Sequence, residues 1–330
     1  MTITSLVTGG AGFIGAHVVN ELIALDHQVI VLDDLSGGFK ENVHPKALLR
    51  VGSITDSTLV DGLFEEYSFT YVYHLAAYAA EGLSHFIRRF NYQNNLIGSV
   101  NLINASVNHN IQCFVFTSSI AVYGTNTLPL SETQHPCPED PYGIAKLAVE
   151  LDLVSAQKLF DLNYIIFRPH NVYGPLQNIG DKYRNVVGIF MNQLLSGIPV
   201  SIYGKGDQSR AFTNINDVAP YIAHSVTIKE ARNEVFNIGS DDVTNVADLA
   251  DNIMDAMQVQ GEITHLAARE EVVHAYSDHS KFNAIFKPSK KTHLKDGLRE
   301  MADWVKEHGI RSTASFNDIE VKKNLPKSWE

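Results

Sequence analysis

The sequence of 330 residues is 45% apolar, which is enough to bury a large core, and its length suits one large domain or two modest ones. Its net charge of −11 argues against a nucleic acid or an anionic membrane surface as the main partner. The first glycine loop begins within ten residues of Met1 and no apolar run is long enough to span a bilayer, so we expect a soluble cytoplasmic protein. Two cysteines and scattered histidines predict neither a disulfide framework nor a metal site.

The chain opens with an apolar run at 3–7 that predicts a strand and an amphipathic run at 16–25 that predicts a helix. The segment Thr8-Gly9-Gly10-Ala11-Gly12-Phe13-Ile14-Gly15 joins them and matches both G-x-G-x-x-G and G-x-x-G-x-x-G. Residues without a Cβ let the backbone turn tightly and approach a pyrophosphate, whose charge is stabilised by the start of the following helix. This context predicts dinucleotide binding.

A second apolar strand at 28–32 ends in Asp33, about twenty residues after the last glycine, where a ribose-binding carboxylate is expected. A carboxylate can accept hydrogen bonds from both ribose hydroxyls and repels a 2′-phosphate. The sequence therefore predicts NAD rather than NADP as the cofactor. The neighbouring Asp34 is the alternative ribose ligand.

Strand and helix patterns alternate through the rest of the first half. The expected strands lie at 49–52, 71–77, 113–117 and 164–167, and the expected helices lie at 57–67, 91–108 and 142–160. This alternation predicts an α/β fold with a doubly wound parallel sheet. The pattern is irregular over 175–210, apart from a helix near 187–195 and a strand at 200–203, and later elements are expected at 234–238, 246–257 and 294–308.

Tyr142 and Lys146 are four residues apart in the helix expected over 142–160, so they lie on one helix face and can reach the same ligand. A nearby ammonium favours the phenolate and lowers the pKa of a tyrosine, which makes the phenol a usable general base. The same spacing also occurs on ordinary solvated helix faces. The pair therefore needs support from the rest of the sequence.

That support comes from the order of the motifs. The glycine loop, Asp33, the segment 74–77, Ser119, Tyr142 and Lys146 together resemble the extended short-chain dehydrogenase/reductase family over nearly the whole chain. Segments 116–124 and 167–175 resemble its nucleotide-sugar epimerases and dehydratases. The resemblance implies Ser119, Tyr142 and Lys146 as catalytic residues. It implies cofactor contacts at Gly9, Gly12, Phe13, Ile14, Gly15, Asp33, Ser53, Ile54, Leu75, Ala76, Ala77, Asn95, Thr117, Tyr142, Lys146 and His170.

The resemblance also implies a nucleotide-sugar site. Its expected residues are Ser119, Tyr142, Asn171, Arg184, Asn185, Ser201, Tyr203, Arg210 and Arg269. Ser53 departs from the family, which usually has an aspartate there for the adenine amino group, although a serine hydroxyl can still accept that hydrogen bond. Arg269 lies close to the family's second diphosphate-binding arginine, ahead of Glu271, and its spacing is ambiguous by one residue.

The residues after Ser119 bear on the type of reaction. The family's dehydratases and decarboxylases place an Asp or Glu there for proton transfer at the sugar, whereas this sequence has Ile120 and Ala121. An aliphatic side chain cannot transfer a proton, so we favour 4-epimerisation of a nucleoside-diphosphate hexose through a 4-keto intermediate. The substrate pair stays open between UDP-glucose with UDP-galactose and UDP-glucuronate with UDP-galacturonate. A nucleotide-sugar dehydratase of the 5,6- or 4,6-type and a non-enzymatic NAD sensor are the alternatives.

The expected organisation is an NAD-binding Rossmann domain, formed by 1–174 with about 215–239, and a smaller substrate-capping domain, formed by 175–214 with 240–330. By resemblance, the helices at 91–108 and 142–160 pair with their copies in a four-helix bundle, which gives a homodimer. Arg184 lies in a segment that closes over the hexose in related enzymes. Its guanidinium can either sit in a solvated loop or pair with the carboxylate of a uronate sugar.

Overall fold

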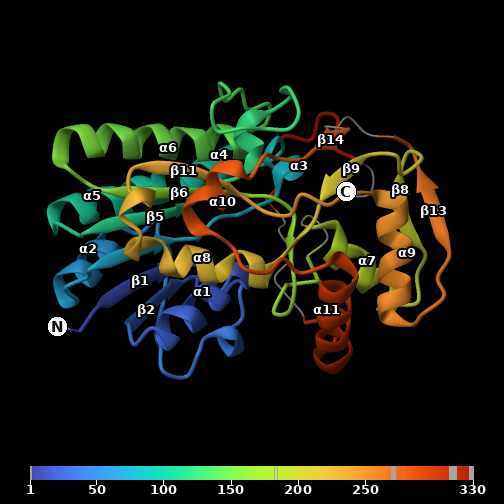
Figure 1. The fold of residues 1–330 in the computed structure, drawn as a ribbon, viewed down its shortest axis with the longest axis horizontal. Helices are drawn as coiled ribbons and strands as arrows, with labels where there is room; N and C mark the ends of the chain where they lie inside the picture. The colour runs from blue at the N-terminus through green and yellow to red at the C-terminus, as the bar shows by residue number, and fades with distance from the viewer. Residues whose placement is uncertain (1, 182, 184, 269–272, 312–317, 327–330) are drawn as a thin grey trace.

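The computed structural model describes residues 2–181, 183, 185–268, 273–311 and 318–326. Within these residues, seven parallel strands form one sheet in the order β11-β6-β5-β4-β1-β2-β3 (Figure 1). The strands are β1 Thr4–Thr8, β2 Gln28–Asp33, β3 Leu48–Val51, β4 Tyr71–His74, β5 Cys113–Thr117, β6 Tyr164–Pro169 and β11 Glu234–Ile238. The strand order reverses between β1 and β4, which is where ligands bind in open parallel sheets. The fold class expected from the sequence is confirmed.

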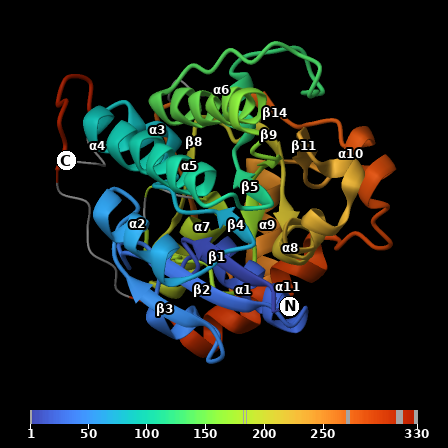
Figure 2. The same ribbon diagram turned by 90° about the vertical axis from the view of Figure 1, so that its left-hand side faces the viewer.

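Helices cover both faces of this sheet (Figure 2). One face carries α1 Phe13–Ala24, α8 Ala219–His224 and α10 Ser280–Phe286, and the other carries α2 Ser57–Glu66, α5 Gly98–Asn108 and α6 Pro141–Phe160. Because both faces are covered, every residue of β5 and β6 is buried, which explains their largely apolar sequences; the charged exception is Arg168 of β6, which pairs with Glu150. No helix in the described part of the chain is long and apolar enough to span a membrane.

A second core lies beside the sheet. Its helices are α7 Val186–Leu195, α9 Val246–Met257 and α11 Leu294–His308. Small sheets surround it, pairing β8 Val200–Tyr203 with β13 Ile263–Leu266, β10 Thr213–Asn214 with β7 Val172–Tyr173, and β9 Ser209–Ala211 with both β12 Val243–Asn245 and β14 His274–Ala275. The chain leaves the large sheet after β6 and returns to it at β11. Residues of the second core therefore lie in the sequence both between these two strands and after β11.

The expected element positions need three corrections. The helix expected over 91–108 is α4 Arg88–Tyr92, a π-helical turn over Gln93–Ile97, and then α5. The strand expected over 71–77 ends at His74, which pairs with Thr8 at the end of β1; the N–H of Leu75 makes the last bond to β1, to the carbonyl oxygen of Thr8. The short helices α3 Glu81–Ser84, α8 and α10 were not expected, since each is too short to show a helical period.

Arg311, which follows α11, connects the second core to the glycine loop. Its Nη1 donates to Asn42 Oδ1 at 2.8 Å, and its guanidinium carbon lies 3.8 Å from the ring centroid of Phe39. Asn42 Nδ2 donates in turn to the carbonyl oxygen of Ala11 at 3.0 Å. Arg311, near the end of the chain, therefore supports the glycine loop near its beginning.

A second contact from the same end of the chain involves Glu320. Its carboxylate accepts hydrogen bonds from the backbone N–H groups of Arg89 at 2.8 Å and Phe90 at 2.9 Å, in the first turn of α4. The Glu320 N–H donates to the carbonyl oxygen of Phe86. Glu320 therefore caps a helix whose own N-cap residue, Ile87, has no side-chain acceptor.

Candidate active site

The glycine loop leaves no room for side chains. Gly9 has a φ of +73°, and a Cβ added to it would lie 2.7 Å from the backbone nitrogen of Ala76. A Cβ on Gly15 would lie 2.0 Å from the carbonyl oxygen of Gly9. Gly12 begins α1 and provides no side-chain cap. The loop and the helix start therefore form an open cradle that fits the pyrophosphate of a dinucleotide.

Asp33 ends β2 beside this cradle and is 8% exposed. Its Oδ2 accepts from the N–H of Ala11 at 2.9 Å and its Oδ1 accepts from the N–H of Leu35 at 2.8 Å. Burial raises the pKa of Asp33, while these backbone donors oppose the rise. Each carboxylate oxygen retains a lone pair for a ribose hydroxyl. Asp34 is exposed and its carboxylate bonds the N–H of Ser36, so Asp33 is the better placed of the two.

The end of β4 is held against the loop by a buried histidine. His74 Nδ1 lies 2.7 Å from Thr8 Oγ1, and its Nε2 lies 2.7 Å from Ser99 Oγ. Burial holds the pKa of His74 well below its usual value, so the ring is neutral and links the two hydroxyls. Thr8 Oγ1 also accepts from the N–H of Ala76 at 3.3 Å. The predicted cofactor segment Leu75, Ala76 and Ala77 is thus fixed at the switch point of the sheet.

Asn95 lies in the π-helical turn, a feature that often marks functional positions. Its Oδ1 accepts from the N–H of Tyr78 at 2.8 Å, and its Nδ2 donates to the carbonyl oxygen of Tyr78 at 3.1 Å. Its amide therefore orients the chain after β4. Ile54 packs against Gly98, where a Cβ would lie 2.6 Å from Ile54 Cγ1, and Ser53 Oγ lies 2.9 Å from Thr55 Oγ1.

Lys146 is 3% exposed, and its Nζ donates to the carbonyl oxygen of Thr117 at 2.8 Å. The ammonium lies 4.7 Å from the ring centroid of Phe116 and 5.8 Å from that of Tyr142. Burial lowers the pKa of Lys146 to about 7, against the opposing charge of Glu150. Thr117 Oγ1 is buried and has no hydrogen-bond partner within the described residues. This hydroxyl is therefore available to hydrogen-bond a ligand beside Lys146.

Ser119 follows the end of β5, and Tyr142 lies in the first turn of α6. Ser119 caps a short 3₁₀ turn over Ile120–Tyr123, and its Oγ accepts from the N–H of Ala121 at 3.1 Å. A Cβ on Gly143 would lie 2.6 Å from the carbonyl oxygen of Ala121, so the first turn of α6 packs directly on this turn. Asp140 begins α6 by accepting from the N–H of Gly143. The structure therefore gathers the three predicted catalytic residues at one strand end.

The sequence analysis missed Glu150, which is 4% exposed on the same face of α6. Its Oε1 accepts from Ser118 Oγ at 2.5 Å and from Arg168 Nε at 3.0 Å. The buried pair holds Ser118, and with it the strand end that presents Ser119. Glu150 could have been recognised from its position four residues after Lys146, because residues 142, 146 and 150 lie on one face of the helix.

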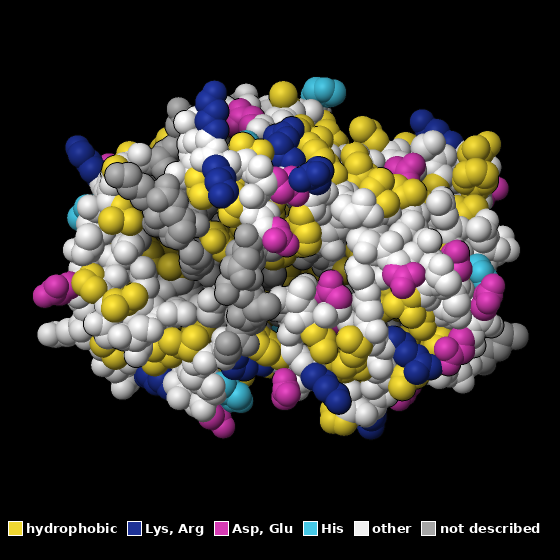
Figure 3. All heavy atoms as spheres, turned by 180° about the vertical axis from the view of Figure 1, so that it is seen from behind, with side chains coloured by type: hydrophobic (Ala, Val, Ile, Leu, Met, Phe, Trp, Pro, Cys, Tyr) yellow, Lys and Arg dark blue, Asp and Glu magenta, His cyan; other side chains and the backbone are white. Residues whose placement is uncertain are grey.

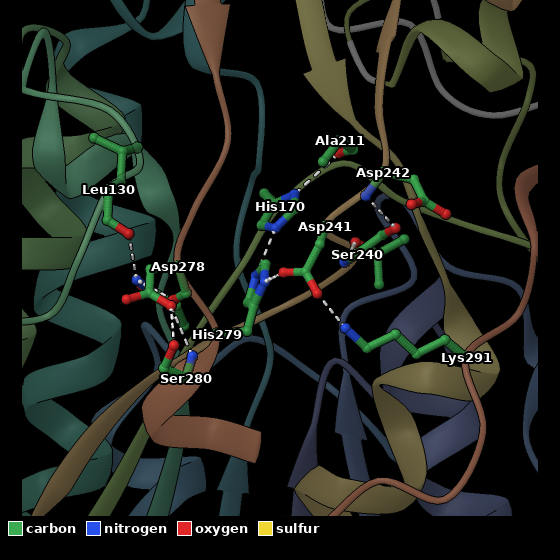
Figure 4. A network of polar contacts seen from close by, with 12 residues as sticks. Leu130, His170, Ala211, Ser240, Asp241, Asp242, Asp278, His279, Ser280 and Lys291 are labelled. Atoms are coloured by element: carbon green, nitrogen blue, oxygen red, sulfur yellow. Dashed lines mark hydrogen bonds and ion pairs between the residues drawn. The ribbon is translucent and has the colours of Figure 1, made fainter. Parts of the chain in front are cut away.

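His170 was predicted to contact the cofactor, but its two ring nitrogens face protein atoms (Figure 4). Its Nδ1 lies 3.0 Å from the carbonyl oxygen of Ala211, and its Nε2 lies 3.0 Å from His279 Nε2. A cofactor contact of His170 would therefore have to use a ring face or the backbone. His279, like His170, is buried.

Apart from Ser119 and Tyr142, the predicted substrate residues that the structure describes lie in three places. Asn171 donates from Nδ2 to the carbonyl oxygen of Ala211 at 3.2 Å, next to Arg210, whose Nη1 donates to the carbonyl oxygens of Ser209 and Val273. Asn185 instead caps α7, with Oδ1 accepting from the N–H of Val187 at 2.9 Å. Ser201 and Tyr203 lie in β8. Arg184 and Arg269 lie outside the described residues. The surface is hollowed between the two halves of the molecule (Figure 3).

Across the described part of the chain, no group of three or more His, Cys, Asp or Glu side chains could hold a metal ion. The glycine loop before α1, the carboxylate at the end of β2 and a buried lysine near a tyrosine all lie at the carboxyl edge of the parallel sheet. Such features are typical of dinucleotide-dependent enzymes. The model of the NAD dependent epimerase/dehydratase family matches residues 5–239, and the chain belongs to this family.

Relatives with named activities cover almost the whole chain. A putative UDP-glucose 4-epimerase of Methanocaldococcus jannaschii is 34% identical, over 91% of this chain and 98% of its own. The crystal structure of a Thermotoga maritima UDP-glucose 4-epimerase with UDP-glucose has a TM-score of 0.88 at 33% identity, covering 92% of this chain and 99% of that one. A Bacillus cereus UDP-glucuronic acid 4-epimerase, in complex with UDP-glucuronic acid and NAD, has a TM-score of 0.84 at 26% identity with the same coverage. NAD is the cofactor of this family.

Proposed function

We propose that this protein catalyses the 4-epimerisation of a UDP-hexose with tightly held NAD. The observation that carries the proposal is that Ser119, Tyr142 and Lys146 are present while the two residues after Ser119, Ile120 and Ala121, are aliphatic. The turn over Ile120–Tyr123 packs on α6 and has no acidic side chain where elimination would need one. Redox chemistry at C4 remains possible, whereas proton transfer at C5 or C6 lacks its acid there.

In this proposal Tyr142 takes the proton of the sugar 4-hydroxyl, and Ser119 hydrogen-bonds the same oxygen. Lys146 lies beneath the Tyr142 ring and, anchored to Thr117 O, stabilises the phenolate. Bound NAD supplies the reversible oxidation at C4. Asn171 and Arg210 hold the diphosphate while the hexose turns over, and Ser201 and Tyr203 line the base pocket. Because oxidation and reduction alternate at one carbon, no external oxidant is consumed.

The substrate pair stays open between the neutral and the uronate sugars. The Thermotoga relative was solved with UDP-glucose and the Bacillus relative with UDP-glucuronic acid, which supports a uridine nucleotide for this chain too. Arg184 is our candidate for the residue that recognises a uronate carboxylate.

The deciding experiment incubates the purified protein with UDP-glucose, UDP-glucuronate, a UDP-N-acetylhexosamine and dTDP-glucose, and identifies the products by NMR and mass spectrometry. We expect a 4-epimer of unchanged mass from one of the first two. A product that has lost the mass of water would identify the rival dehydratase. NAD binding without any product from these sugars would favour the non-enzymatic sensor.

We further propose a homodimer, with α5 and α6 of each copy in a four-helix bundle. Leu151, Leu159 and Phe160 of α6 are 61%, 73% and 57% exposed, and Ile97, just before α5, is 43% exposed. Figure 3 shows hydrophobic side chains at the upper right, the end of the molecule that carries these helices. An apolar helix face of this kind is typical of a protein interface. The proposed domains are those expected from the sequence, with β11 completing the NAD-binding sheet.

A further inference from the structure

Two buried histidines form a chain of polar contacts that reaches Ala211, the last residue of β9 (Figure 4). His170 Nδ1 lies 3.0 Å from the carbonyl oxygen of Ala211, and His170 Nε2 lies 3.0 Å from His279 Nε2. His279 Nδ1 lies 2.6 Å from Asp241 Oδ1, and Asp241 also pairs with Lys291. The space is closed, because a Cβ on Gly239 would lie 2.2 Å from His170 Nε2.

The contacts fix the number of protons in this pair. A carbonyl oxygen and an ionised carboxylate only accept, so both Nδ1 atoms must carry a proton. The two Nε2 atoms face one another and need one proton between them. Two neutral imidazoles have two ring protons in total, whereas these contacts need three. The pair therefore carries one positive charge.

The surrounding groups show where the extra proton resides. The hydrogen bond from His279 and the ammonium of Lys291 hold the pKa of Asp241 well below its usual value, so Asp241 is a carboxylate. Burial, and to a smaller extent His279, lower the pKa of His170 to about 4, so His170 is neutral near pH 7. His279 is then the imidazolium, and its buried charge is compensated by Asp241.

We propose that His279 is held as an imidazolium and acts through His170 as a positioning residue for β9, the strand that carries Arg210. The carbonyl oxygen of Ala211 accepts from both His170 and Asn171, so one backbone group joins the end of β6 to β9. The benefit for a diphosphate substrate rests on the proposed function, in which Arg210 and Asn171 bind it.

Charged groups face the pair from several elements. Asp241 follows β11, Lys291 follows α10, and Asp278 precedes His279 with its carboxylate bonded to the N–H and Oγ of Ser280. With one ring proton fewer, the two Nε2 lone pairs would face each other, and with one more, two N–H groups would face each other. The link between the rings therefore requires three ring protons on the pair.

The first test uses the wild-type protein, labelled with ¹⁵N in its histidine rings, at pH 7. We expect both Nδ1 resonances of the pair at the protonated position, and the two Nε2 resonances to share one proton. The variants His170→Gln and His279→Gln assign the signals, and His135→Gln, at an exposed histidine, is the matched control. Two protons on the pair instead of three would overturn the proposal.

The second test follows β9 itself. In His279→Gln we expect the backbone amide resonances of 209–212 to shift and UDP to bind about ten- to a hundredfold more weakly, the effect of one charge-assisted hydrogen bond. His135→Gln should change neither. Unchanged resonances at 209–212 in a folded His279→Gln would overturn the positioning role. If the wild type itself fails to bind UDP, the proposed function fails, and the resonances of 209–212 still decide the role of His279.

Discussion

Arg311 Nη1 donates to Asn42 Oδ1 at 2.8 Å, although the two residues are 269 positions apart. The guanidinium lies between the rings of Phe39 and Trp304, at 3.8 Å and 5.1 Å from their centroids. Asn42 passes this support to the carbonyl oxygen of Ala11, inside the glycine loop. Arg311 thereby supports the glycine loop, which we propose to hold the pyrophosphate of NAD.

Replacing Arg311 should therefore loosen the cofactor. The variant Arg311→Ala loses the stacked guanidinium and two hydrogen bonds, so we expect NAD to dissociate about ten times faster or more. The release rate can be measured by rapid dilution of the loaded protein and fluorescence detection. Arg299→Ala, at an exposed arginine of α11, is the control. An unchanged release rate in a folded Arg311→Ala would show that the contact does not act on NAD.

Tyr142→Phe should retain NAD and lose turnover. The substitution removes the phenolic hydroxyl and leaves the buried ring, so we expect turnover to fall by about 10²–10⁴-fold, as for other lost acid–base groups. Turnover is measured by product NMR and bound NAD by its release on denaturation. Near-normal turnover would remove Tyr142 from the mechanism.

Asp33 should set the preference for NAD through charge repulsion. We expect the wild type to bind NADP far more weakly than NAD, and Asp33→Asn to narrow that ratio, because the amide no longer repels a 2′-phosphate. Both affinities are measured by calorimetry on cofactor-free protein. Asp34→Asn is the matched control at an exposed neighbour, and the ratio should not change there. Equal affinities of the wild type for the two cofactors would mean that Asp33 does not face the ribose.

The burial of Lys146 predicts a pH-dependent stability. Its pKa is about 7 in the folded protein and 10.5 ordinarily, so between these values the unfolded chain binds a proton that the folded one releases. Stability from this group therefore rises with pH. The stability advantage of Lys146→Met over the wild type should shrink from pH 7 to pH 10, by up to about 1.4 kcal/mol per pH unit. The free energy of unfolding is measured by urea titration at each pH for the wild type, Lys146→Met and the control Lys158→Met. Parallel pH profiles for all three proteins would contradict the prediction.

Arg184 should discriminate between the two substrate pairs if it binds a uronate carboxylate. We then expect Arg184→Ala to lose kcat/KM on UDP-glucuronate and UDP-galacturonate while that on the neutral sugars is unchanged. The measurement compares kcat/KM on both pairs. An equal effect on both, or none, would return Arg184 to the role of a solvated loop residue.

Local sequence patterns predicted the frame of this site well. The glycine spacing and Asp33 predicted a loop and a strand end that the structure places side by side, and the expected strands at 113–117 and 164–167 appeared as apolar runs. These features depend on neighbouring residues, so the chain shows them without its fold. The same applies to Tyr142 and Lys146, which share a helix face.

The supporting contacts were not predictable in this way. His170 meets His279 across 109 positions, and Glu150 meets Arg168 across 18 positions between a helix and a strand. Such pairs form only when the sheet and the second core are assembled, and periodicity does not encode them. The π-helical turn at Gln93–Ile97 was missed because the residues around it read as one uninterrupted helix.

The cap on α4 also has a consequence for the order in which the protein is completed during synthesis. Glu320 accepts from Phe90, which leaves the ribosome 230 residues earlier. At about 5–20 residues per second, the start of α4 waits on the order of 10–50 s for its acceptor. Until then the N–H groups of Arg89 and Phe90 can bond only water. The first turn of α4 is therefore among the last parts of a newly made chain to be completed.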